Sequence, residues 1–206
     1  MKKFFFENRI NFLFLFISFL CLIGTIGAEN ISFQSIKWLH NRDDIAASHF
    51  GWYFFKNDIW IFPLGRHPNY GDGIGSSIVF IDSVPILSLI FKLFSSFLPE
   101  PFQYISFLYF ICFYLQLFFA YKILKKFTNS DLYSVIGSLF FIIAPIFIWT
   151  SQLSPGLSNQ WILLLALYVA LIQKINKSKL LWFFLIILSS VINFYFMITI
   201  VRKSVV

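Results

Sequence analysis

Long runs of apolar residues, separated by short polar segments, dominate the chain. A helix that crosses a bilayer needs about 20 predominantly apolar residues. We therefore expect five membrane spans, at about residues 10–27, 102–121, 132–150, 159–173 and 180–201. Pro145 lies inside the third run, where it should kink the helix or loosen its last turns.

The first apolar run has two interpretations. Lys2, Lys3 and Arg9 precede it and Gly27-Ala28 follows it, as in a signal peptide with a small-residue cleavage site. However, the apolar run is about 17 residues long, near the minimum for a span, and further apolar runs follow it. These features favour a retained first helix.

Residues 83–98 are also apolar, but their polar residues recur at helical intervals. Ser88, Lys92, Ser95 and Ser96 would lie on one face of a helix. Such a helix tends to lie in the membrane interface. With a second interfacial helix expected after Asp43, the predicted fold is an all-α membrane protein. Its first extracytoplasmic loop, about 29–101, would carry both interfacial helices.

The composition and the charges agree with this pattern. Apolar residues make up 59% of the chain and charged residues 12%, against about 45–50% and about 25% in soluble domains. The net charge of +7 comes from Lys and Arg residues at the ends of apolar runs. That placement argues against a nucleic-acid partner.

Positive charge also predicts the orientation of the chain. If residues 83–98 lie flat, the basic clusters within 2–9, 122–126 and 174–179 all face the cytoplasm. We therefore expect an integral protein of the bacterial cytoplasmic (inner) membrane with its N-terminus inside. Arg202 and Lys203 would then lie outside, against the trend.

Most residues that could take part in chemistry lie in the predicted extracytoplasmic loop. It contains or borders on seven of the nine acidic residues and contains all three histidines. Asp43 can cap the helix that begins there, and Asp44 suits its first turn. Asp44, Ala47, Ser48 and Gly51 would share one small, polar face that leaves space beside the Asp44 carboxylate. Asp44 is therefore either a helix-terminal residue or a functional carboxylate.

A turn-rich stretch between Phe62 and Pro85 contains further candidates. Its segment 71–75, Gly-Asp-Gly-Ile-Gly, resembles a phosphate loop only faintly, because no Lys-Ser/Thr ending follows and no strand precedes it. Backbone amides there could still approach an anionic head group. Arg66 and His67 could supply positive charge to a phosphate.

Asp82 has two interpretations. It could cap the helix that follows it, with Pro85 in the first turn, or it could be a second carboxylate that faces Asp44 across the loop. A metal site formed by His49 and His67 with Asp44, Asp72 or Asp82 is an alternative, although these spacings match no standard metal motif. Within the predicted spans, Gln116 and Asn193 are interpreted as helix-to-helix hydrogen-bonding residues.

The arrangement resembles the GT-C superfamily of polytopic glycosyltransferases. In those enzymes the first helix is followed by a long extracytoplasmic loop with interfacial helices and an acidic residue, a position that Asp44, with Asp43, matches here. The loop also resembles an uncharacterised family of bacterial membrane proteins placed near that superfamily. The stretches that carry this second resemblance are His49–Phe55, Phe62–Gly65, Gly75–Pro85 and Leu98–Tyr104.

The resemblance implies an enzyme that transfers a sugar from a polyprenyl-phosphate donor to an acceptor glycan or protein at the outer face of the membrane. Asp44 would be the general base, or would bind a divalent metal ion that orients the donor phosphate, and Asp82 would support it. The substrate-binding residues would be Asp43, His49, Arg66, His67, Tyr70 and Asp72.

Three further expectations accompany this assignment. Members of such families are typically longer, so we expect the chain to be an N-terminal portion. Membrane lipid and the lipid-linked sugar are the expected partners. The alternatives to an enzyme are a non-catalytic membrane protein that binds or scaffolds lipid-linked glycans, and a transporter.

Overall fold

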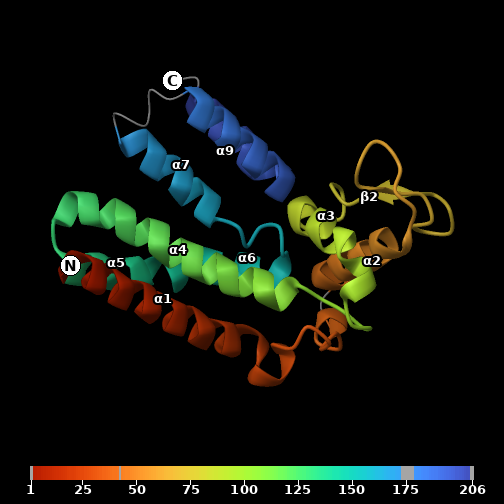
Figure 1. Cartoon of the computed structure of the whole chain (residues 1–206), viewed down its shortest axis with the longest axis horizontal. Helices are drawn as coiled ribbons and strands as arrows, with labels where there is room; N and C mark the ends of the chain where they lie inside the picture. The colour runs from red at the N-terminus through yellow and green to blue at the C-terminus, as the bar shows by residue number, and fades with distance from the viewer. Residues whose placement is uncertain (1, 42, 173–178, 205–206) are drawn as a thin grey trace.

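The computed structural model describes residues 2–41, 43–172 and 179–204, which form a helical bundle with a cap at one end (Figure 1). We define the cap as residues 28–104. Apart from two strands of two residues each, the regular elements are helices. The predicted all-α class is therefore confirmed for the described part of the chain.

Two long apolar helices form the centre of the bundle. They are α1, Lys2–Ile26, and α4, Ile105–Thr128, which pack against one another with Phe14 and Leu117 fully buried. With 24 residues, α4 is about 36 Å long, enough to cross a hydrocarbon core of about 30 Å. These helices correspond to the first two predicted spans, and they are the two described helices long and apolar enough to cross a membrane.

The third predicted span is bent. It consists of α5, Asp131–Ile142, and α6, Pro145–Leu153, whose axes differ by 45°. The bend occurs where Pro145 begins α6, because proline lacks the N–H that would continue the helical ladder. The predicted kink is confirmed, and the pair together could form one further span.

The predicted fifth span, 180–201, is wrong as one continuous helix. Two helices replace it: α9, Lys179–Ile192, and α10, Phe194–Ser204, which pack against one another. The chain turns at Asn193, whose Oδ1 accepts a hydrogen bond from the backbone N–H of Tyr195 in the first turn of α10. The C-terminus returns to the start of α9 (Figure 1), so the two helices form a hairpin.

The hairpin changes the expected position of the basic tail. Because α10 runs back along α9, Arg202 near the end of α10 lies at the same end of the hairpin as Lys179 at the start of α9. Neither α9 nor α7, Trp161–Leu171, reaches the length of a complete span. By length and composition the described residues therefore contain two candidate spans, or three with the bent pair, and the predicted number of five is not reached.

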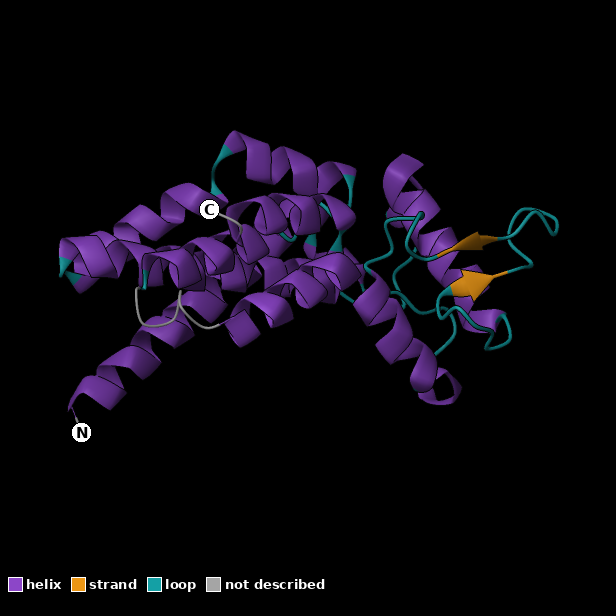
Figure 2. Ribbon diagram, turned by 90° about the horizontal axis from the view of Figure 1, so that it is seen from above, coloured by secondary structure: helices purple, strands orange, loops and turns teal. Residues whose placement is uncertain are grey.

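The cap contains two helices and a small hairpin. The helices are α2, Asp43–Asn57, and α3, Pro85–Leu93; strands β1, Arg66–His67, and β2, Ser76–Ser77, pair antiparallel (orange in Figure 2). Short 3-10 turns, η1, η2 and η3, cover Ala28–Asn30, Leu39–Asn41 and Ser95–Phe97. Aromatic and aliphatic side chains form the cap core: Trp52, Phe55, Ile78, Phe102 and Tyr104.

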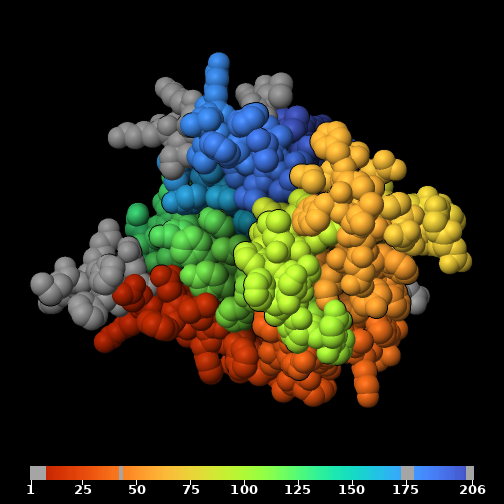
Figure 3. Space-filling view, turned by 45° about the vertical axis from the view of Figure 1, so that its right-hand side comes forward, coloured from red at the N-terminus to blue at the C-terminus, as the bar shows by residue number. Residues whose placement is uncertain are grey.

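Helix α3 is amphipathic as predicted, but its polar face points into the cap. Ser88 is buried and hydrogen bonds to the Tyr104 hydroxyl at 2.7 Å, and Lys92 is only 3% exposed. The opposite side is apolar and exposed, with Leu93 at 69% and Phe97 at 86%. The segment of α3 and η3 (yellow-green in Figure 3) therefore presents an apolar surface on the outside of the cap.

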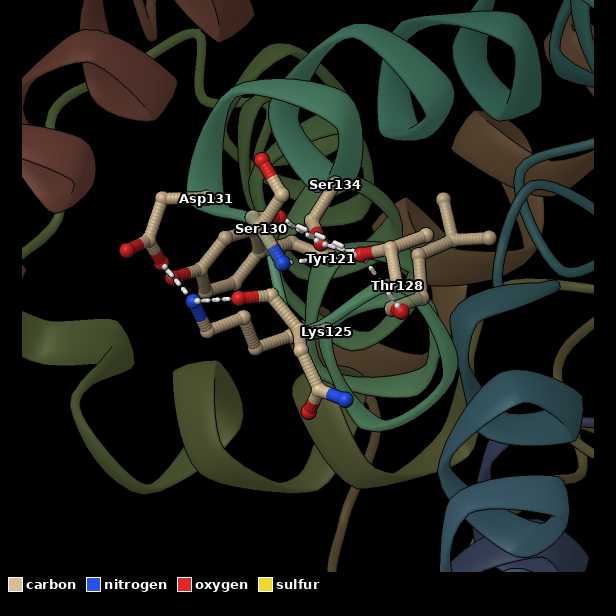
Figure 4. A network of polar contacts seen from close by, with 8 residues as sticks. Tyr121, Lys125, Thr128, Ser130, Asp131 and Ser134 are labelled. Carbon is tan, nitrogen blue, oxygen red and sulfur yellow. Dashed lines mark hydrogen bonds and ion pairs between the residues drawn. The ribbon is translucent and has the colours of Figure 1, made fainter.

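Polar contacts stabilise the turn between α4 and α5 (Figure 4). This turn lies at the end of the bundle away from the cap (Figure 1). The Tyr121 hydroxyl donates to Asp131 Oδ1 at 2.6 Å, and Lys125 Nζ lies 2.8 Å from the same oxygen. Asn129 takes the left-handed conformation that ends α4. The basic residues at the end of α4 thus lie at the end of the bundle opposite the cap.

Candidate functional site

Asp82 lies where the cap meets the tip of the α9–α10 hairpin. Its Oδ1 accepts a hydrogen bond from Asn193 Nδ2 at 2.9 Å, and the Gly156 backbone N–H also donates to the carboxylate. Asp82 has φ 56° and Val84 has φ 50°, a region that side-chain-bearing residues rarely adopt. Such conformations persist where the surroundings enforce them, and they cluster at functional sites.

The interpretation of Asp82 as a helix cap is wrong. Helix α3 begins at Pro85, its N-cap position is Val84, and no side chain caps it. Pro85 does lie in the first turn, where its fixed φ suits a helix start. The Asp82 side chain instead points toward the α9–α10 hairpin and Gly156. This leaves the alternative in which Asp82 faces Asp44.

One face of α2 supports Asp82 from the other side. Ser48 Oγ donates to the Asp82 carbonyl oxygen at 3.2 Å. A Cβ added to Gly51 would clash with Ile81 Cγ2, so the glycine allows the 81–82 backbone to approach the helix. The small face predicted on α2 is therefore occupied by this segment rather than by open space. Asp44 lies exposed at the start of the same helix.

The electrostatic environment of Asp82 suits proton transfer. The pKa of Asp82 is raised from its usual 3.8 to about 6, chiefly by burial and in smaller part by the Asp44 carboxylate. The hydrogen bonds from Asn193 and Gly156 oppose the increase by stabilising the charged form. A carboxylate whose pKa lies near the operating pH can both accept and release a proton efficiently.

A cleft of about 450 Å³ opens beside Asp82. This volume is in the range of small-molecule sites, which are typically apolar with a few polar groups. Three separate parts of the chain form its walls: the end of the 62–85 stretch, the loop before α7, and the tip of the α9–α10 hairpin. The lining residues are Val79, Phe80, Asp82, Pro85, Leu157, Ser190, Ile192, Asn193, Phe194 and Tyr195.

The predicted histidine ligands lie in separate places. His49 is buried, and its Nδ1 lies 3.4 Å from His40 Nε2. The pKa of His49 is lowered from its usual 6.5 to about 4, chiefly by burial and in smaller part by His40. His67 is fully buried, stacks edge-on against Tyr70 and has no hydrogen-bond partner for Nε2 among the described residues. Its predicted contact with a phosphate is therefore wrong for this conformation.

The remaining predicted residues are also dispersed. Arg66 is exposed on β1, and Asp72 is exposed in the turn between the strands. The side chain of Asp43 lies outside the described part of the structure. No group of three His, Cys, Asp or Glu residues among those described could hold a metal ion. Asp44 interacts electrostatically with Asp82 and raises its pKa, whereas neither His49 nor His67 belongs to a group of three possible metal ligands among the described residues.

Sequence reasoning missed the partners of Asp82. Asn193 was interpreted as a helix-to-helix residue, yet it contacts a loop residue of the cap. Gly156 was not considered, although a Pro-Gly pair between two apolar runs is a turn signal. The close packing of Asp82 Oδ1 against Gly156 leaves no room for a Cβ there. The sequence signal for Asn193 is its own polarity, because it lies inside the last apolar run.

A second buried charge was also missed. Lys92 Nζ lies 4.0 Å from the centre of the Phe55 ring and 4.7 Å from that of Trp60, and it has no hydrogen-bond partner among the described residues. Burial lowers the pKa of Lys92, while the nearby Asp58 carboxylate opposes that decrease. Asp58 itself accepts two hydrogen bonds from Asn69. This cluster fixes the position of α3 in the cap.

These features define an all-α protein with at least two helices that could span a membrane, and with a cleft between the cap and a helical hairpin that the carboxylate of Asp82 lines. The chain belongs to the DUF6311 family, a domain of unknown function, whose model matches residues 15–202. Searches of curated proteins and of solved structures found no significant match. The matched region contains Asp44, Asp82 and Asn193, so the whole candidate site lies within the family domain.

Proposed function

We propose that the chain is a glycosyltransferase of the GT-C type, or part of one, which transfers a sugar from a polyprenyl-phosphate donor at the outer face of the membrane. One observation carries this proposal: the Asp82 carboxylate lines a cleft of about 450 Å³ and lies close enough to Asp44 for the two charges to interact. A carboxylate that lines a cleft and interacts with a second carboxylate is suited to acid–base chemistry on a hydroxyl group.

In the proposed reaction, an acceptor hydroxyl attacks the anomeric carbon of the donor sugar. The bond from that carbon to the phosphate oxygen breaks, and the phosphate leaves with the electron pair. Asp82 takes the proton of the acceptor hydroxyl as the new bond forms. We assign the base to Asp82 rather than to Asp44, because Asp82 lines the cleft and Asp44 is exposed. Asp44 tunes the proton affinity of Asp82.

The surface of the cap supports a position in the outer membrane interface. The apolar side of α3 and η3 is exposed, including Phe94 and Phe97, while Ser88 and Lys92 on the polar side of α3 are buried. An interfacial helix buries such an apolar side at the boundary between lipid head groups and acyl chains. The basic residues at the end of α4 lie at the opposite end of the bundle (Figure 1). A lipid-linked donor would therefore reach the cap from within the outer leaflet.

The test is sugar transfer by the full chain in lipid nanodiscs, with radiolabelled polyprenyl-phosphate sugars and extracted envelope glycans as acceptors. Asp82→Asn should lower the transfer rate by at least about 100-fold, the lower end of the contribution of a general base. Glu29→Gln, which removes an exposed carboxylate elsewhere in the cap, should transfer normally. Wild-type rates in a folded Asp82→Asn variant would reject the assignment.

The same assay separates the alternatives. A protein that only binds or scaffolds lipid-linked glycans would retain the labelled donor without forming product in any variant. A transporter would move the unchanged donor across a proteoliposome membrane. Because the readouts are product, retained donor and translocated donor, one set of samples distinguishes the three functions.

A further inference from the structure

A second hollow, of about 560 Å³, adjoins the carboxylate cleft. Val79 and Phe80 line both spaces, so this pair forms a ridge between them. The residues that line this second hollow include one with a charged side chain, Arg66, and two serines, Ser76 and Ser77. Its lining residues are Pro63, Leu64, Arg66, Pro68, Ile74, Gly75, Ser76, Ser77, Val79 and Phe80.

The β1–β2 pairing explains which polar groups face this hollow. Arg66 is the direct cross-strand partner of Ser77, and such partners project from the same side of a sheet. His67 follows Arg66 on the strand, so its side chain projects to the opposite side, where it is buried in the cap core. The guanidinium of Arg66 and the hydroxyl of Ser77 therefore lie on one face without the histidine.

The Arg66 guanidinium forms no ion pair within the described part of the chain. The ion pairs among the described residues are Lys56 with Glu100 and Lys125 with Asp131, and no described side chain forms a hydrogen bond with Arg66. Apolar side chains that are largely exposed surround it: Ile74 is 90% exposed and Phe80 is 85% exposed, with Leu64 also exposed. A free cation within an exposed apolar rim is suited to an anion that carries an apolar chain.

We infer that the Arg66 hollow binds the phosphate of a lipid phosphate, with Ser77 as a hydroxyl partner and Leu64, Ile74 and Phe80 in contact with the apolar chain. The inference deepens the proposed function, because it places the phosphate on one side of the Val79–Phe80 ridge and the carboxylate cleft on the other. A lipid-linked sugar that crosses the ridge would present its sugar to Asp82. Phosphate binding itself does not depend on catalysis.

Binding of a polyprenyl phosphate without a sugar tests this inference. The full chain is placed in phosphatidylcholine nanodiscs, and bound lipid phosphate is measured by native mass spectrometry against its mole fraction in the disc. Arg66→Gln should weaken binding by about ten-fold or more, because it removes a bidentate, charge-assisted contact. The affinity of Arg66→Lys should lie between those of wild type and Arg66→Gln, because lysine keeps the charge and loses the planar, two-pronged geometry of the guanidinium.

Matched variants keep the test specific. Lys37→Gln removes an equal charge from another exposed site of the cap and should bind as wild type does. Phe80→Ser should weaken binding of polyprenyl phosphate and leave binding of inorganic phosphate unchanged. If Arg66→Gln binds normally while folded, or if Lys37→Gln loses as much affinity, the inference is overturned.

The source of the phosphate is decided by competition. Exclusion of polyprenyl phosphate by an equal amount of phosphatidylglycerol, in an Arg66-dependent way, would identify a general anionic lipid site. Failure of phosphatidylglycerol to compete would identify a polyprenyl phosphate site. Inorganic phosphate that binds as tightly as either lipid would overturn the role of the apolar rim.

The failure of this inference is distinguishable from failure of the proposed function. Asp82→Asn should retain lipid phosphate and lose sugar transfer, while Arg66→Gln should lose both. Arg66-dependent binding with normal transfer by Asp82→Asn would leave the lipid phosphate site in place and reject the catalytic assignment. Loss of transfer in Asp82→Asn, with binding that does not depend on Arg66, would support the catalytic assignment and reject the lipid phosphate site.

Discussion

Replacing Asp82 by Asn should make the protein more stable above about pH 6. Folding raises the pKa of this carboxyl from 3.8 to about 6, chiefly by burial, so the folded state disfavours its charged form. About two pKa units at roughly 1.4 kcal/mol each correspond to about 3 kcal/mol at pH 7 and above. Asn carries no charge and keeps an oxygen that accepts the hydrogen bond of Asn193.

The stability of Asp82→Asn relative to wild type should increase with pH. Because the folded pKa of Asp82 lies above its unfolded value, the carboxyl contributes its full stability below about pH 4 and loses it as the pH rises through about 6. The advantage of Asn should therefore be small near pH 4, grow up to about pH 6 and level off by pH 7. New amide hydrogens that find no partner would reduce the plateau by about 1 kcal/mol.

Thermal unfolding in detergent micelles, followed by circular dichroism from pH 4 to pH 8, measures this difference. Wild type and Asp82→Asn are compared at each pH, so the titration of the other carboxyls cancels. Glu29→Gln serves as the control for removal of an exposed carboxyl and should show no such trend. A raised pKa of Asp82 in the folded state is refuted if Asp82→Asn is less stable than wild type at pH 8. It is also refuted if the difference in stability does not change with pH.

Two further substitutions test the packing of the cap. Gly51→Ala should destabilise the protein by about 1–3 kcal/mol, because its Cβ would clash with Ile81; adding Ile81→Ala should recover part of that loss in thermal unfolding, and purely additive losses would contradict the contact. Lys92→Met should leave stability at pH 7 unchanged or raise it by about 1 kcal/mol, because Lys92 is buried without a hydrogen bond. A large loss on unfolding in the same detergent would instead show that the contact with Phe55 outweighs desolvation.

The predictions that succeeded depended on local properties. The hydropathy of a run locates α1 and α4, and the missing N–H of Pro145 produces the bend wherever its neighbours lie. The small face of α2 follows from helical periodicity alone. For Asp82, the backbone conformation at Val84 excludes the helix cap, and the role as a second carboxylate facing Asp44 stays a prediction.

The predictions that failed depended on distant contacts. The turn at Asn193 interrupts an apolar run, and hydropathy averaged over that run does not reveal the turn. The hydrogen-bond partner of Asn193, Asp82, lies 111 positions earlier in the chain. The spacing of Ser88 and Lys92 shows that α3 has a polar side, but only contacts with Tyr104 and Phe55 decide that this side faces inward. Periodicity identifies a face and does not say what will cover it.

The side-chain amide of Asn193 forms hydrogen bonds through both its oxygen and its nitrogen. Its Oδ1 starts α10, while its Nδ2 holds the carboxylate of Asp82. A proton or a ligand that draws Asp82 away would therefore loosen the first turn of α10. Because such linkage is reciprocal, any force that shifts α10 would in turn change how tightly Asp82 holds a proton. The hairpin tip thus links the proton affinity of Asp82 to the position of α10.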